Sequence, residues 1–231
     1  MLIILAKQQD ENAARLADRW RSHDAVLVTA VDLSKSGWSL HLASSTRSRM
    51  PIGDRQFMDE EIKGVLTLIP RIYSEDLDHI VPSDRQYVAS EMSAFLLAWL
   101  SSLRCPVLNR PTAESLSGPD WRVETWIHLA GQLGIPVSTV HRRTPSRVCD
   151  LEAQPACEIT VIGGECFGKA VPQLIANTRL LAKTAGTDML TAHFASNKPD
   201  SVFVSASPWP DLASPELADA ALRHLEGRSP C

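Results

Sequence analysis

The sequence predicts an α/β fold, with an open βα sheet in the first half and an α+β arrangement in the second half. Strand-like and helix-like segments alternate in the first third of the chain, as they do where parallel strands are joined by helices. After residue 156 the order becomes strand, strand, helix, strand, strand, helix. The 231 residues are 44% hydrophobic and 22% charged, which is ordinary for a folded globular chain and too apolar for general disorder.

The first third supplies the elements of the predicted parallel sheet. Short apolar or β-branched runs predict strands, and the spacing of Ala13, Leu16 and Trp20 predicts a helix with one buried face. The expected elements are, in order, a strand at Leu2–Ala6, a helix at Glu11–Ser22, strands at Val26–Val31 and Trp38–Ala43, a short helix at Asp59–Leu66 and a strand at Ile69–Tyr73.

The middle of the chain predicts two helices separated by a short strand. Ser83 and Gln86 have the spacing of a capping box before a long helix at Asp84–Leu103. The segments that follow are a strand at Val107–Asn109, a loop at Pro111–Pro119, a helix at Asp120–Leu133 stopped by Gly134, and a loop at Thr144–Pro155.

The last third predicts an antiparallel sheet with two helices. Gly163-Gly164 between Cys157–Ile162 and Cys166–Ala170 is a strong hairpin signal. Ser214 and Pro215 suit the cap and first position of the final helix. The remaining elements are a helix at Pro172–Ala185, a strand containing Leu190, Ala192 and Phe194, and a strand at Val202–Ala206.

Charge and composition exclude several classes of protein. Lys and Arg number 23 against 27 Asp and Glu, so the net charge of −4 argues against general nucleic-acid binding. No stretch approaches the roughly 20 apolar residues of a membrane helix, and the apolar opening is too short for a secretory signal. The five cysteines show no metal-binding spacing. We therefore expect a cytoplasmic protein that contacts neither nucleic acid nor a membrane.

The order of short motifs resembles the ATP-grasp carboxylate–amine ligases, nearest to the branch that tailors ribosomally made peptides. The matching segments are Ile69-Pro70-Arg71-Ile72-Tyr73, the helix containing Glu91, Val107-Leu108-Asn109-Arg110-Pro111, Gly134-Ile135-Pro136-Val137-Ser138-Thr139 and Pro210-Asp211-Leu212. This resemblance implies a pre-ATP-grasp-like βα domain at residues 1–118. It also implies an ATP-grasp-like α+β domain of ββαββα order at residues 119–231, truncated so that the lid subdomain is missing.

The chain departs from the family at the positions that would hold magnesium. The family uses an Asp, followed by a Glu and an Asn two residues apart on the next strand. The resemblance places Asp188 at the first position as the sole remnant ligand, with Ser205 and Ser207 in place of the other two. Hydroxyls are poor ligands for hard divalent cations. We therefore expect no bound metal and no cofactor, with ATP and magnesium required only if the chain is still a ligase.

The family's phosphate-covering subdomain has no room here. Only residues 140–156 lie between Thr139 and Cys157, and Arg122 stands where the family has a lysine. Because phosphoryl transfer depends on positioned cations and donors, these departures predict the loss of that chemistry.

Five residues are the candidate ligand-binding positions, and the three arginines among them lie near the C-terminal end of a strand or the start of a helix, where open α/β sheets form a crevice. The five are Arg71, Asn109, Arg110, Arg122 and Trp126. The arginines suit an acidic ligand, and the alternative is ordinary surface arginines paired with Glu91, Glu114 or Glu124. Trp126 is either part of a peptide groove or part of the core.

These features predict a non-catalytic binding or accessory protein that acts on a peptide, carrier or enzyme partner in a biosynthetic pathway. A homo-oligomer is compatible with this role. The alternative is an ATP-dependent carboxylate–amine ligase with a reduced active site. A third hypothesis is an ATP-independent activity in the same crevice.

Overall fold

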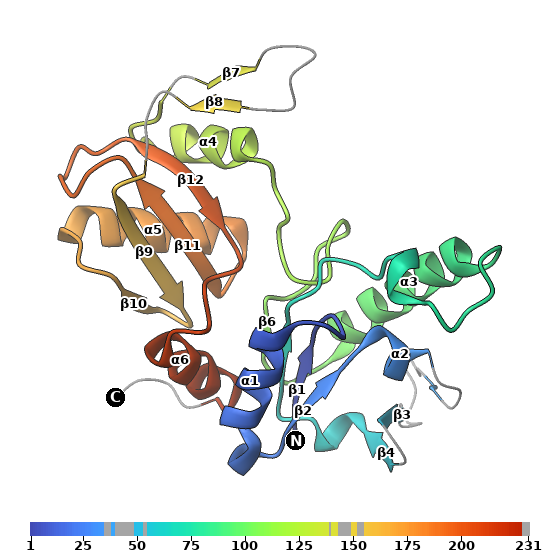
Figure 1. Cartoon of the computed structure of the whole chain (residues 1–231). Coiled ribbons are helices and arrows are strands. Elements are labelled where there is room, and N and C mark those ends of the chain that lie inside the picture. The colour runs from blue at the N-terminus through green and yellow to red at the C-terminus, as the bar shows by residue number, and fades with distance from the viewer. Residues whose placement is uncertain are drawn as a thin grey trace. The chain divides into compact units, whose positions relative to one another are not determined.

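The computed structural model describes residues 1–34, 38–39, 49–52, 55–138, 140–142, 149–151 and 155–227. The chain forms two compact units (Figure 1). Unit 1 contains Met1–Gly118 together with the chain from Leu212 onward, and unit 2 is Pro119–Asp211.

The sheet of unit 1 is parallel and has the strand order β2-β1-β5-β6. Its strands are β1 (Leu2–Leu5), β2 (Ala25–Val28), β5 (Gly64–Thr67) and β6 (Val107–Leu108). Every residue of β1 and β5 is buried, as expected for central strands covered on both faces.

The sheet of unit 1 is accompanied by four α-helices and three single 3₁₀ turns among the described residues. The helices are α1 (Glu11–Arg19), α2 (Ala30–Leu33), α3 (Arg85–Ser102) and α6 (Pro215–Leu225), and the turns are η1 (Arg21–His23), η2 (Asp59–Glu61) and η3 (Ser74–Asp76). The core of this unit combines Trp99 and Leu100 of α3 with Ile3, Leu5 and Val65. A separate antiparallel pair consists of β3 (Arg49–Ile52) and β4 (Arg55–Met58).

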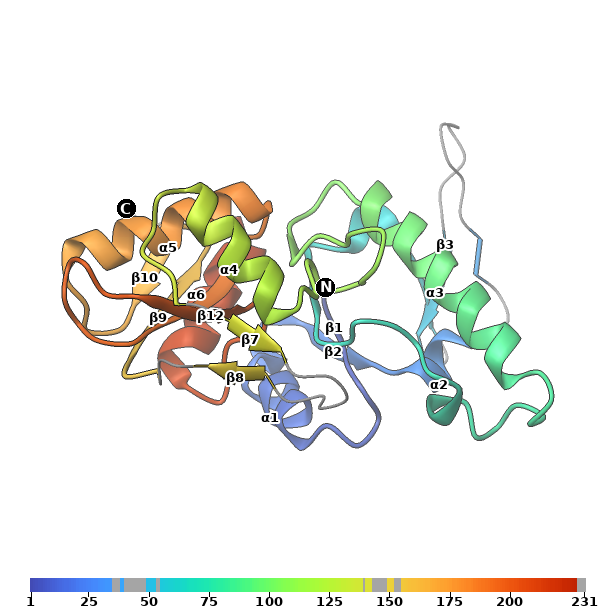
Figure 2. The same ribbon diagram turned by 90° about the horizontal axis from the view of Figure 1, so that it is seen from above.

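Unit 2 is built on an antiparallel sheet with the order β10-β9-β11-β12. Its strands are β9 (Cys157–Ile162), β10 (Glu165–Phe167), β11 (Met189–Phe194) and β12 (Phe203–Ser207). Two helices, α4 (Val123–Gln132) and α5 (Pro172–Ala185), lie on the same side of this sheet (Figure 2). The strands β7 (Val140–Arg142) and β8 (Cys149–Leu151) form a further antiparallel pair.

Several sequence predictions are confirmed. Gly163 and Gly164 join β9 to β10 and have φ angles of 55° and 91°. Positive φ angles at both turn residues favour glycine, which is why the glycine pair predicted a hairpin. Pro215 occupies the first turn of α6, and Gly186 ends α5 in a left-handed conformation.

The predicted helix at Asp59–Leu66 and strand at Ile69–Tyr73 are wrong. Asp59–Glu61 forms only one 3₁₀ turn, and the strand is Gly64–Thr67. This run is short and wholly buried between β1 and β6, so it has none of the polar alternation that would have marked it. Ile69 is buried but lies outside the sheet.

Other boundaries also differ. Cys149–Leu151, predicted as part of a loop, is the strand β8. The Ser83–Gln86 capping box does not form, because the Ser83 hydroxyl donates to Asp84 Oδ1 and α3 begins at Arg85. Of the predicted strand at Trp38–Ala43, residues 40–43 lie outside the described residues, and Ser39 forms an isolated bridge.

The last helix belongs to unit 1, although the sequence assigned residues 119–231 to one domain. α6 packs on β5 and β6. Arg19 of α1 holds Asp219 through three hydrogen bonds of 2.9–3.1 Å. His23 Nδ1 lies 2.8 Å from Glu226 Oε1. These contacts group the C-terminal helix with the parallel sheet. Within the described part of the chain, no helix combines the length and the apolar character needed to cross a membrane.

Candidate functional site

The sheet of unit 2 has one apolar face and one polar face. Ile159, Ala192 and Phe194 belong to the core that includes residues of α4 and α5. Because side chains alternate along a strand, the intervening residues face the other way. The polar residues of this second face, called the polar face below, are Glu158, Thr160, Glu165, Thr191, His193, Ser205 and Ser207, and Ile162, Phe167 and Met189 lie among them.

His193 is the centre of the polar face. It pairs across the sheet with Glu158 of β9 and with Ser205 of β12. Its Nδ1 lies 3.2 Å from Ser205 Oγ, and its Nε2 lies 3.5 Å from Glu158 Oε2. The Thr160 and Thr191 hydroxyls lie 2.8 Å apart on the same face. The imidazole therefore connects a hydroxyl to a carboxylate within the sheet.

Asp188 does not lie beside these residues in the sheet. It comes one residue before β11, and its carbonyl accepts a hydrogen bond from Gly163 N. The β11 residue opposite Ser205 is His193, and a residue five positions away in a strand points to the other face. Asp188 and Ser205 are therefore not brought together as ligands of one ion.

The donors of the polar face do not suit magnesium. Around His193 they comprise one carboxylate, one imidazole and four hydroxyls, and a second carboxylate, Glu165, lies opposite Ile162 on the edge strand β10. Mg²⁺ is held by carboxylates and phosphate oxygens, so one carboxylate beside His193 is a weak donor set. The Ser207 hydroxyl also accepts a hydrogen bond from Trp209 N, at 3.2 Å. Among the described residues, no group of three or more His, Cys, Asp or Glu side chains could hold a metal ion.

The three candidate arginines are divided between the two units. Arg71 is exposed after β5 in unit 1, and Arg122 is exposed before α4 in unit 2. The Arg110 guanidinium in unit 1 donates to the carbonyls of Leu103 and Cys105, at 3.2 and 3.1 Å. Among the described residues, the hydrogen-bond partners of the Arg110 side chain are thus the carbonyls that follow α3.

The other two candidates are enclosed by protein. Asn109 has 0% exposure, and Gly118 passes so close that an added Cβ would lie 2.7 Å from Asn109 Cβ. Trp126 has 1% exposure, and its ring centroid lies 4.8 Å from that of Trp121. Trp126 thus takes the core position that the sequence left open.

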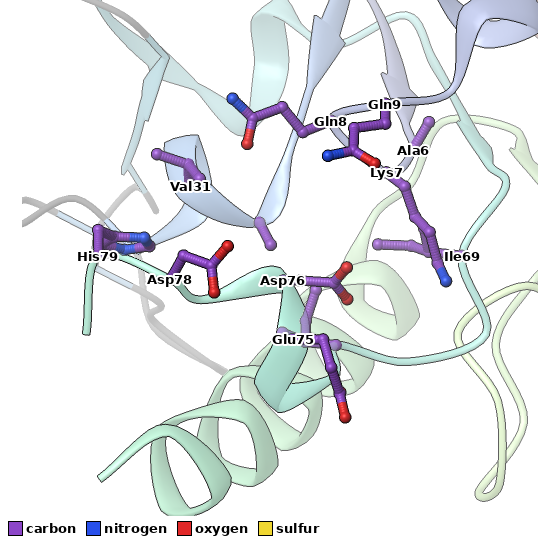
Figure 3. Close-up of a pocket in the computed structure, with 12 residues that line it drawn as sticks. Ala6, Lys7, Gln8, Gln9, Val31, Ile69, Glu75, Asp76, Asp78 and His79 are labelled. Atoms are coloured by element: carbon purple, nitrogen blue, oxygen red, sulfur yellow. The ribbon is translucent and has the colours of Figure 1, made fainter. Parts of the chain in front are cut away.

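A cavity of about 490 Å³ in unit 1 was missed by the sequence reasoning (Figure 3). It lies at the carboxyl ends of β1, β2 and β5, the edge at which open parallel sheets bind ligands. Its lining residues are Ala6, Lys7, Gln8, Gln9, Ala30, Val31, Ile69, Ile72, Glu75, Asp76, Asp78 and His79. The polar run Lys7-Gln8-Gln9 after a buried strand was the signal available in the sequence.

Most charged groups around the cavity have partners in unit 1. Asp78 lies 3.3 Å from Arg85, and Lys7 Nζ lies 5.0 Å from the centre of the Tyr73 ring. Hydrogen bonds from its own backbone N–H and from the Ser74 hydroxyl, with a smaller effect of Lys7, lower the pKa of Glu75. The cavity therefore combines fixed carboxylates with one nearby lysine.

Solved structures with a similar fold include a macrocyclase and two ATP-grasp ligases. The macrocyclase MdnC of Microcystis aeruginosa MRC, bound to its precursor peptide MdnA, has 13% identity, a TM-score of 0.71, and coverage of 97% of this chain and 98% of its own. The chain has an ATP-grasp fold. A RiPP-associated ATP-grasp ligase of Chryseobacterium gregarium, in complex with ADP and a leader and core peptide, has 10% identity and a TM-score of 0.68, with coverage of 99% and 97%. The ATP-grasp ligase PsnB, complexed with a minimal precursor, has 11% identity and a TM-score of 0.67, with coverage of 96% and 98%.

The ATP-grasp resemblance is thus confirmed at the level of the fold, in which a parallel and an antiparallel sheet occur together. No protein-family model matches the chain, and the search of curated proteins gave no match. Identities of 10–13% leave activity to be argued from the residues of the site.

Proposed function

We propose that this ATP-grasp-fold chain is a non-catalytic binding or accessory protein that acts on a peptide partner in a biosynthetic pathway. The observation that carries the proposal is the donor set of the unit 2 polar face. His193 pairs there with Ser205 and Glu158, and the other carboxylate of this face among the described residues, Glu165, lies on the edge strand β10 opposite Ile162. Hydroxyls and one imidazole would hold a magnesium–triphosphate complex poorly.

The peptide partner is supported by the complexes in which the fold occurs. MdnC is bound with the precursor peptide MdnA, and the Chryseobacterium gregarium ligase with a leader and core peptide. A chain that keeps this architecture and changes its cation ligands can retain peptide binding without phosphoryl transfer. The short segment at residues 140–156, the crevice carrying Arg71, Arg110 and Arg122, the homo-oligomer and the cytoplasmic location remain predictions.

The test is a nucleotide thermal shift combined with an assay for ADP release. A ligand present at a hundred times its Kd stabilises a fold by about 2.7 kcal/mol, so nucleotide binding is easily detected. We expect no change in Tm with ATP and Mg²⁺ and no ADP release, with the Chryseobacterium gregarium ligase, which was solved in complex with ADP, as the control. A magnesium-dependent rise in Tm together with ADP formation would overturn the proposal.

A second candidate is an ATP-dependent carboxylate–amine ligase with a reduced active site. It is favoured by the fold shared with a ligase that was solved in complex with ADP. This candidate requires ATP and magnesium to act together, so the same pair of assays separates it from the first.

A further inference from the structure

The cavity of unit 1 has the size and position of a ligand site. Its volume of about 490 Å³ lies within the range of small-ligand pockets, roughly 300–1,000 Å³. Three connections supply its walls: the chain between β1 and α1, the start of α2, and the segment running from Ile69 to His79. All of these segments belong to unit 1, so unit 1 alone supplies the residues that line the cavity.

Part of the lining is apolar. Ala6, Ala30, Ile69 and Ile72 are buried, and the partly buried Val31 lies among them. Such a surface suits the aliphatic stem of a long side chain, which gains from leaving water.

Several polar groups around the cavity have no hydrogen bond to the described part of the chain. The side-chain amides of Gln8 and Gln9 project over the cavity from the β1–α1 connection (Figure 3). Asp76 uses Oδ2 to accept from Tyr73 N, at 3.0 Å, and its Oδ1 has no donor among those residues. These groups can receive a ligand without breaking an existing bond.

The charge of the lining selects the kind of ligand. Glu75, Asp76 and Asp78 contribute three carboxylates, against Lys7 as the lysine of the lining. The negative charge of Asp78 is offset by Arg85, which lies outside the cavity lining. Lys7 lies near Glu75. The Glu75 side chain points away from Asp78 in Figure 3. Asp76 is the carboxylate left without a cationic partner among the described residues. An anionic ligand would be repelled by this lining.

We propose that the cavity binds a basic side chain, that of a lysine or arginine, presented by the peptide partner. The aliphatic stem lies along Val31 and Ile69, the charged head reaches Asp76, and the amides of Gln8 and Gln9 bind the peptide backbone. The identity of the ligand as a peptide rests on the proposed function, whereas its charge rests on the cavity itself.

The experiment compares short peptides on the native chain by NMR. Three peptides with the same glycine–serine flanks carry arginine, its neutral isostere citrulline, or glutamate at the centre. The signals followed are the backbone amides of Lys7–Gln9 and of Asp76–His79. We expect the arginine peptide to shift these amides and the citrulline and glutamate peptides to leave them in place.

Two variants then locate the charge. Asp76→Asn keeps an oxygen that can accept from Tyr73 N but removes the negative charge. Because hydrogen bonds to charged groups are stronger than neutral ones, the Kd of the arginine peptide should rise about tenfold. Asp18→Asn makes the same change on α1, where Asp18 pairs with Arg21, and should leave binding unchanged.

Equal shifts by the arginine and citrulline peptides, preference for glutamate, or no shift with any peptide would overturn the inference. So would unchanged binding in Asp76→Asn. The two tests can be told apart. ADP formation refutes the proposed function whatever the peptides do. If no peptide shifts the cavity amides and no ADP forms, only the inference about the cavity is refuted.

Discussion

The substitution Gly64→Ala tests how tightly the C-terminal helix is packed on the parallel sheet. Gly64 begins β5 and has no room for a side chain. An added Cβ would lie 2.7 Å from Leu225 O, 2.9 Å from Leu225 Cβ and 3.2 Å from Leu225 Cα. Contacts between such atoms are normally about 3.5–4.0 Å, so either the strand or α6 must move.

The expected loss of folding free energy depends on which atoms can move away from the added Cβ. The closest atoms belong to the backbone and Cβ of Leu225, so a side-chain rotation cannot relieve the contact. α6 is also held by Arg19–Asp219 and His23–Glu226. Overpacking costs about 1–3 kcal/mol, and we expect the upper end of that range. With a urea dependence of about 1–3 kcal/mol/M, the midpoint of urea unfolding should fall by roughly 1 M or more.

Gly131→Ala is the matched control. Gly131 lies in α4, and its added Cβ would meet only Val137 Cγ2, at 3.8 Å. Alanine stabilises a helix interior by roughly 0.5–1 kcal/mol relative to glycine, so the free energy of unfolding should rise. If both variants shift the urea midpoint alike, or Gly64→Ala is neutral, the packing of α6 on β5 described above is refuted.

Three further perturbations have distinct expected outcomes. The double variant Ser205→Glu/Ser207→Asn restores the ligand types of the resembled family. We expect calorimetry to detect Mg²⁺ binding by this variant and none by the native chain. If the variant binds Mg²⁺ no better than the native chain, the residue types at these positions are not decisive. Arg110→Ala removes two hydrogen bonds to the carbonyls of Leu103 and Cys105 and should lower the free energy of unfolding by about 1 kcal/mol, as measured in urea. Burial raises the pKa of the Cys105 thiol above its ordinary value of 9.0, because the folded state disfavours the thiolate. The folded state is therefore unaffected by this thiol below about pH 9 and loses stability as the pH rises further and the thiol ionises. Cys105→Ala should therefore reduce the alkaline loss of stability, and an unchanged pH profile would contradict this assignment.

The sequence predicted the elements that local chemistry determines. The glycine pair at Gly163-Gly164, the proline at the start of α6 and the glycine after α5 each act on their own backbone, so their meaning needs no tertiary information. β5 was missed because it is four residues long and buried on both faces, and the acidic run at Asp59–Glu61 imitated the start of a helix.

The candidate site was less predictable because it depends on register and on distant contacts. The resemblance placed Asp188 and Ser205 at two ligand positions of one site, but the β11–β12 ladder places His193 opposite that serine. A single chain position cannot show which residue faces it across a sheet. The unit 1 cavity likewise combines three connections that are far apart in the sequence.

The most direct test of the central claim is whether the native chain binds a divalent cation together with nucleotide. Mn²⁺ can replace Mg²⁺ as a paramagnetic probe, and its immobilisation on a protein enhances the relaxation of water protons. With Mn²⁺ and ATP we expect no enhancement as the native chain is titrated, because the polar face around His193 offers hydroxyls where carboxylates are required. A saturable enhancement that disappears in His193→Ala would contradict the account.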